Sequence, residues 1–315
     1  MRYFHLKRLG VLLLAAFALS SQAAGPHAYV PNEKSGSVSI IDVATDRRIG
    51  EFAVGKRPRG NATDGRLLYL TEAEGGLLLV VDPEARRLIR SAPLGKSPEG
   101  IGVSADGRLL AAAVEADNSV VLFDTTSVRE LARIRVEGKN PEHAVFSPDG
   151  RWLYVSAEDA EQVDVVDVAL RRQVASIAVG KRPRGIVFTP DGRRAYVACE
   201  IAGKVYAIDV AERKVLAVIP AGQFPNGVVV HPDGRRVFVS NGRDGTVMVI
   251  DTVKNAVVGS VAVGKRPWNM ALTPDGGKLY VANGRSNSVS VIDTGSLKTL
   301  AEIEVGEMPW GVSIR

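Results

Sequence analysis

The sequence predicts an all-β fold, a seven-bladed β-propeller with four strands in each blade. A module of about 42 residues recurs seven times along the 315-residue chain, and its last copy is incomplete. The aspartate that ends the third segment of each module returns at intervals of 40, 42, 43, 42, 42 and 42 residues. Every full module holds four strand-length segments separated by turns. Repeats of about 40–45 residues with four strands each are typical of propeller blades.

The first residues have the pattern of a secretory signal peptide. An apolar stretch at 9–19 is too short to span a bilayer, which takes about 20 residues. Small residues in Ser21-Gln22-Ala23 fit a cleavage site. Three basic residues come before the apolar stretch: Arg2, Lys7 and Arg8. We expect residues 1–23 to be removed, and residues 24–315 to form one domain; an uncleaved anchor is the alternative.

Composition limits the partners and the compartment. The signal predicts export to the periplasm, and no other segment is apolar enough to cross a membrane. Loss of residues 1–23 lowers the formal net charge from +5 to +2, because that segment holds three basic and no acidic residues. A nearly balanced chain argues against nucleic acid as a partner. The single cysteine, Cys199, has no disulfide partner and follows an apolar run, so we expect it to be buried.

One module, residues 180–221, shows the order of the elements. A GKRPRG turn leads into an apolar inner strand, and a Thr-Pro-Asp-Gly turn at 189–192 has the composition of a type I turn. The segments RAYVACE, KVYAIDV and KVLAVIPAG follow as the second, third and outer strands. Third-strand segments such as VYAID and VMVID are apolar throughout. This pattern indicates strands that neighbouring blades cover on both faces.

The two ends of the repeat predict how the ring closes. HAYVPN at 27–32 matches a second strand, and PWGVSIR at 309–315 matches a first strand. One blade is therefore built from both termini, with the C-terminal strand innermost, which leaves no open edge. A second irregularity is GNATDG at 60–65, which is two residues shorter than its counterpart at 185–192. We expect a short inner strand there, polar at Asn61.

The pieces AYVPN, LYVSA, AYVAC, VFVSN and LYVAN, together with the VID segments and G-K-x-P turns, resemble the YVTN family of β-propeller repeats. Seven repeats and an export signal resemble, within that family, the group associated with PQQ-dependent catabolism of alcohols. The resemblance implies a role beside quinoprotein dehydrogenases and an associated transport system.

Positions that every module keeps are expected to serve the blade, and positions that differ are the functional candidates. The seven strand-ending aspartates belong to the first class: Asp42, Asp82, Asp124, Asp167, Asp209, Asp251 and Asp293. The G-K-x-P turns supply candidates for binding a ligand or partner at the channel mouth: Arg57, Arg59, Glu99, Glu142, His143, Arg182, Arg184, Asn226, Arg266, Trp268 and Trp310. Phe224 and Met308 fill equivalent slots.

A second set of loops contributes charges to the same face. Three successive modules supply acids: Glu72, Glu74, Glu115, Asp117, Glu158, Asp159 and Glu161. Two later modules supply Arg243 and Arg285. We expect an acidic arc opposite a basic arc with aromatics. Either the charges pair along a solvated rim, or the arginines grip carboxylates while Trp268 and Trp310 stack on a planar ring. PQQ, a polycarboxylate quinone, matches the second interpretation, in which arginines and tryptophans bind a ligand, although no cofactor is firmly implied.

Three functions follow from this pattern. The first is a non-catalytic periplasmic protein, a monomer, that binds a protein or small molecule and assists quinoprotein alcohol oxidation. The second is a hydrolase of the propeller-lactonase type, with Glu99, Glu142, His143 and Arg184 as its candidates. The third is a carrier of a planar cofactor such as PQQ or a haem. His27 and His231 are expected away from the channel, and no CxxCH, nucleophile elbow, zinc-binding His/Glu pair or P-loop occurs in the chain.

Overall fold

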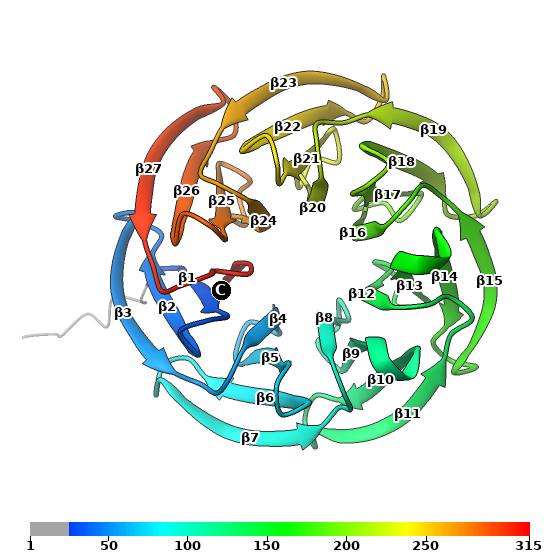
Figure 1. The fold of residues 1–315 in the computed structure, drawn as a ribbon, viewed down its shortest axis with the longest axis horizontal. Coiled ribbons are helices and arrows are strands. Elements are labelled where there is room, and N and C mark those ends of the chain that lie inside the picture. Colours follow the sequence, from blue (N-terminus) through cyan, green and yellow to red (C-terminus); the bar gives the residue numbers. More distant parts are fainter. Residues whose placement is uncertain (1–24) are drawn as a thin grey trace, which may run out of the picture.

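The computed structural model describes residues 25–315 and confirms the seven-bladed propeller. Seven antiparallel sheets of four strands stand radially around a central channel (Figure 1). In this part of the chain the only helical elements are two 3₁₀ turns, η1 (Glu115–Asp117) and η2 (Glu158–Ala160). None of the helices described is long and apolar enough to span a membrane. The predicted signal peptide lies outside the described residues.

Each blade runs from an inner strand at the channel to an outer strand at the rim. The inner strands are β4 (Pro58–Thr63), β8 (Pro98–Val103), β12 (Pro141–Phe146), β16 (Pro183–Phe188), β20 (Pro225–Val230), β24 (Pro267–Leu272) and β28 (Ser313–Ile314). The second strands are β1 (His27–Asn32), β5 (Leu68–Glu72), β9 (Leu109–Val114), β13 (Trp152–Ala157), β17 (Arg194–Cys199), β21 (Arg236–Asn241) and β25 (Lys278–Asn283).

The third strands are β2 (Ser37–Asp42), β6 (Leu77–Asp82), β10 (Ser119–Asp124), β14 (Gln162–Asp167), β18 (Lys204–Asp209), β22 (Thr246–Asp251) and β26 (Ser288–Asp293). The outer strands are β3 (Arg47–Ala53), β7 (Arg87–Pro93), β11 (Arg129–Arg135), β15 (Arg172–Ala178), β19 (Lys214–Pro220), β23 (Ala256–Ala262) and β27 (Lys298–Glu304). We number the blades 1 to 7 along the chain, so that blade 1 contains β28, β1, β2 and β3.

The core lies between adjacent blades. Tyr196 and Val205 of blade 5, for example, pack with Val237 and Val239 of blade 6. Because each sheet has a neighbour on both faces, the second and third strands are almost entirely buried, which explains their continuous apolar sequences. Cys199 is fully buried as expected, and burial raises the pKa of its thiol to about 12.

The aspartate at the end of each third strand has the structural role that its repetition predicts. The Oδ1 atom of Asp42 accepts the amides of Ala44 and Thr45 at 2.8 and 2.9 Å. Its six counterparts accept backbone amides two or three residues ahead in the same way. These amides hold the pKa of Asp42 below its usual value, since they stabilise the carboxylate.

Both termini complete blade 1, as predicted. β28 pairs antiparallel with β1, and His27 and Arg315 exchange two backbone hydrogen bonds of 2.8 and 3.1 Å. The amide of Trp310 donates to the carbonyl of Pro31 at 2.9 Å. The Arg315 side chain reaches blade 2, where its Nη2 lies 2.6 Å from Glu84. The last residues therefore complete the sheet of blade 1 and link it to blade 2.

The prediction of a short inner strand in blade 2 is wrong. β4 has six residues, as many as β8 or β16, so the two missing residues come from the following turn. Asp64 closes this tighter turn by accepting the amides of Arg66 and Leu67. Asn61 is the polar position expected, and its side-chain amide donates to the hydroxyl of Ser313 in β28 at 2.7 Å.

Deletion of residues 311–315 should lower the melting temperature by about 10 °C or more, because it removes the innermost strand of blade 1 and its link to blade 2. Differential scanning calorimetry measures this directly. The matched control is Arg315→Ala, which keeps the strand and loses only the side chain. A truncated protein that melts with the full-length chain would contradict the closure described above.

Candidate functional site

Every G-K-x-P turn has the same backbone geometry at the channel mouth. The residue before the proline is left-handed in all seven turns, with φ between 51 and 60°. Its carbonyl accepts the amide of the residue that follows the second strand of the same blade, at 2.8–3.1 Å. Each blade therefore presents three side chains close together: one before the proline, one after it, and one from the loop.

These positions form three rings around the mouth. The pre-proline ring consists of Arg57, Ser97, Asn140, Arg182, Phe224, Arg266 and Met308. The post-proline ring consists of Arg59, Glu99, Glu142, Arg184, Asn226, Trp268 and Trp310. The loop ring consists of Glu33, Ala73, Glu115, Glu158, Glu200, Gly242 and Gly284.

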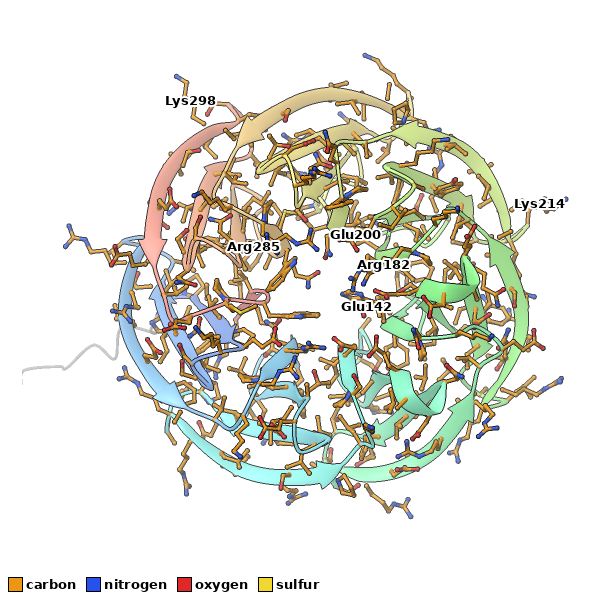
Figure 2. The ribbon with its side chains drawn as sticks, in the orientation of Figure 1. Glu142, Arg182, Glu200, Lys214, Arg285 and Lys298 are labelled. Atoms are coloured by element: carbon orange, nitrogen blue, oxygen red, sulfur yellow. The ribbon has the colours of Figure 1, made fainter. Side chains whose placement is uncertain are left out.

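The rings enclose a cavity of about 510 Å³, which we call the mouth pocket. Apart from Asn269, all of the residues that line it belong to the three rings. Ten of the eleven residues predicted from the sequence line this pocket, and the exception is His143. Figure 2 shows Glu142, Arg182 and Glu200 close together at one side of the channel.

One half of the mouth pocket is organised by Glu33, a buried residue of blade 1. Its Oε1 accepts hydrogen bonds from Nη2 of Arg57 at 2.8 Å and from Nε of Arg59 at 3.1 Å. Arg59 also pairs with Glu99 of blade 3. Three neighbouring blades are therefore joined by a chain of alternating charges.

The other half is organised by Glu200, whose side chain is only 2% exposed. Its oxygens lie 3.3 Å from Arg182, 3.0 Å from Arg184 and 2.7 Å from Arg266. Arg184 also pairs with Glu142 and, at 2.6 Å, with Glu158. The expectation of separate acidic and basic arcs is wrong, because burial of these carboxylates requires an arginine beside each of them.

The electrostatics of the pocket follow from this close packing. Burial and the charge of Glu142 raise the pKa of Glu158 to about 7. Burial is the largest influence on Glu142 and acts to raise its pKa, but Arg184, His143 and Arg59 together hold that pKa below its usual value. Burial lowers the pKa of His143, so its imidazole is neutral at pH 7. Glu158 can therefore exchange a proton near neutral pH.

Two arginines keep part of their guanidinium groups available. The side chains of Arg57 and Arg182 are 47% and 43% exposed. Arg57 uses Nε and Nη2 for Glu33, and Arg182 uses Nε for Glu158 and Glu200. Within residues 25–315, Nη1 of Arg57 and both Nη atoms of Arg182 have no hydrogen-bond partner. Each guanidinium is thus fixed along one edge and free along another.

Trp310 lines the mouth pocket and also contacts His143. Its indole stacks on the imidazole of His143 with ring centroids 5.7 Å apart and planes at 24°. Trp310 belongs to blade 1 and His143 to blade 4, which lie on opposite sides of the ring. Neither nitrogen of His143 has a hydrogen-bond partner among the described residues. The imidazole packs against Trp310 and does not itself line the pocket.

Gly284 leaves the space that the indole of Trp268 occupies. A Cβ atom on Gly284 would lie 2.7 Å from the indole of Trp268, so no larger residue fits there. This explains why blade 7 lacks the glutamate that four other blades carry at the same position of the loop ring. His231 lies in a turn beside Asp233, and His27 begins β1, both away from the pocket as expected.

Sequence reasoning missed Glu33, Glu200, Asn269 and Ser97. The signal for the first two was present, because Glu33, Glu115, Glu158 and Glu200 occupy one position of the repeat, directly after the second strand. Asn269 gives no such signal. Carboxylate oxygens of Glu99, Glu115 and Glu142 also lie within 4.8 Å of one another. Each of these carboxylates also accepts a hydrogen bond, from Arg59, Ser97 and Arg184 respectively.

Replacement of Glu158 by Gln should change how stability depends on pH. The folded-state pKa of about 7 lies above the ordinary value of 4.5, so the stability that Glu158 contributes is lost as pH rises through 7. Between about pH 5 and pH 8, the wild-type protein should lose on the order of 1 kcal/mol or more of unfolding free energy that E158Q keeps. Urea unfolding at several pH values measures this. Glu212→Gln, an exposed change on the opposite face, should show no such difference from wild type, and equal slopes for E158Q and wild type would refute the assignment.

The comparisons with known proteins agree with this architecture. The family "Lactonase, 7-bladed beta-propeller" matches residues 17–172 and 168–312. No curated protein sequence gives a significant match. The solved hydrazine synthase of Kuenenia stuttgartiensis is similar at 25% identity and a TM-score of 0.78, over 91% of this chain and all of that one.

Two further structures share the fold at 18% identity. A functionally unknown protein from Desulfotomaculum acetoxidans has a TM-score of 0.79 over 91% of this chain and 98% of its own. Dihydro-heme d1 dehydrogenase NirN in complex with DHE has a TM-score of 0.68 over 91% of this chain and 74% of its own. These matches extend over nearly all of the described residues. The chain belongs to the lactonase family of seven-bladed β-propellers.

Proposed function

We propose that the protein is an exported, non-catalytic binding protein that holds a small planar organic acid in the mouth pocket. The observation that carries this proposal is the state of Arg57 and Arg182. Buried glutamates fix both guanidinium groups along one edge, and the free N–H donors remain at the pocket. Such pre-oriented forks bind carboxylates bidentately and lose little freedom in doing so.

The remaining walls suit the same kind of ligand. Trp310 and Trp268 offer flat apolar surfaces to a planar ring. Six glutamates surround five arginines in this network, so a ligand anion meets a nearly neutral site. A proton on Glu158 removes one negative charge from the wall. The affinity for an acid should therefore be higher below pH 7 than above it.

PQQ is the candidate that the YVTN resemblance supplies, since it is planar and carries several carboxylates. In that setting the protein would act in the periplasm, beside quinoprotein alcohol oxidation and its transport system. The mouth pocket fits PQQ better than haem. A haem needs an axial ligand, and the imidazole of His143 faces Trp310 instead of the pocket.

Titration of the mature protein with PQQ, followed by tryptophan fluorescence, tests this proposal. We expect saturable quenching at micromolar ligand and an affinity loss of about tenfold or more in R57Q and in R182Q, because each loses a charge-assisted fork. Lys214→Gln, a charge change on the outer rim, is the matched control and should bind like wild type. A signal that does not saturate would remove PQQ as the ligand.

A lactonase-type hydrolase is the second candidate, favoured by the family to which the chain belongs. Glu142, Arg184 and the neutral His143 lie together, so a base and a cation are available close to the pocket. Hydrolysis of a panel of sugar and aromatic lactones should be measured for wild type, H143A and E142Q. We expect no turnover above the buffer rate. Turnover that both variants lose would replace the binding role with an enzymatic one.

A further inference from the structure

A second cavity lies on the same face, over blades 6 and 7 and outside the mouth pocket. Its volume is about 750 Å³, and it shares only the side chain of Arg266 with that pocket. We call it the rim groove. Its basic and aromatic walls are Phe224, Arg243, Lys265, Arg266 and Arg285.

Blades 1 and 2 show how two positions of this groove can be occupied by a pair of opposite charges. These positions are the second residue of the G-K-x-P turn and the second residue of the loop after the second strand. In blade 1 these positions hold Glu307 and Lys34, an ion pair of 2.7 Å. In blade 2 they hold Lys56 and Glu74, an ion pair of 3.1 Å. The scaffold thus brings the two side chains together, and opposite charges satisfy both.

In blade 7 the same two positions hold Lys265 and Arg285. The amide of Arg285 donates to the carbonyl of Lys265 at 3.0 Å, so the backbone brings two like charges side by side. Both side chains are exposed, and neither has a carboxylate within 4 Å in residues 25–315. In blades 1 and 2 a carboxylate occupies one of the two positions. In blade 7 neither position holds one, and the two adjacent cations repel each other.

The neighbouring blade adds to the positive charge. Arg243 of blade 6 is also unpaired in the described part of the chain. Its guanidinium and that of Arg266 both lie 5.5 Å from the ring centroid of Phe224, which holds them on one aromatic surface. The one acid of the groove, Asp244, accepts the amide of Gln223 at 2.7 Å. Arg243, Lys265 and Arg285 therefore line one groove as cations without a carboxylate partner in residues 25–315.

We propose that the rim groove is a second binding site, for a small molecule with two or more oxyanionic groups, either carboxylates or phosphates. Lys265 and Arg285 would share one such group, and the forks of Arg243 and Arg266 a second. Phe224 would contact the apolar part of the ligand. The site goes beyond the function proposed for the mouth pocket, since it shares only Arg266 with that pocket and needs no planar ring.

Citrate and inorganic pyrophosphate are suitable probes, each titrated by calorimetry at low ionic strength, where screening is weakest. We expect saturable binding of at least one probe, with an affinity loss of about tenfold or more in K265Q/R285Q and in R243Q. The probe that binds more tightly identifies the oxyanion. K214Q/K298Q removes the same net charge from the outer rim and should bind like wild type (Figure 2).

Equal weakening in K265Q/R285Q and K214Q/K298Q would show a general charge effect and overturn the site, as would binding that none of these changes alters. K265Q/R285Q should fold normally and melt no lower than wild type without the probe, because the substitution relieves repulsion. R57Q/R182Q should still bind citrate or pyrophosphate. Failure of PQQ binding therefore leaves this result untouched, and the two proposals are tested separately.

Discussion

One backbone hydrogen bond, repeated in all seven blades, positions the face of the molecule on which both cavities lie. It joins the left-handed residue of each G-K-x-P turn to the loop after the second strand. The proline that follows keeps this residue out of the right-handed helical region. With the turn and the loop locked together, any residues placed at these positions become neighbours. The three rings of side chains are a consequence of this one contact.

The mouth pocket shows how a regular scaffold can bury many charges. Glu200 is nearly inaccessible, yet three arginines from two blades contact it. Such a network tolerates burial because each carboxylate has a guanidinium beside it, and the loss of one partner would leave the others unpaired. The same ion pairs hold the guanidinium groups in fixed positions, as a site for an organic acid requires.

The rim groove uses the same scaffold in the opposite way. Blades 1 and 2 place opposite charges at the two adjoining positions, whereas blade 7 places Lys265 and Arg285 there. A repeat protein provides its own control for this comparison, because the backbone is the same in each blade. Because Lys265 and Arg285 of blade 7 have no carboxylate partner among the described residues, a ligand can supply the missing negative charge.

The sequence alone determined the ring, because a fixed period, seven turn prolines and seven strand-ending aspartates are local signals that need no knowledge of contacts. It also located ten residues of the mouth pocket, since these occupy the positions of the turns that vary from one module to the next. The pairing of Glu33 and Glu200 with arginines, the length of β4 and the stacking of Trp310 on His143 were decided only by the tertiary structure. The pairings and the stacking depend on how blades meet around the channel, where residues far apart in the chain come together only when the ring has closed, whereas the length of β4 depends on how the following turn is closed.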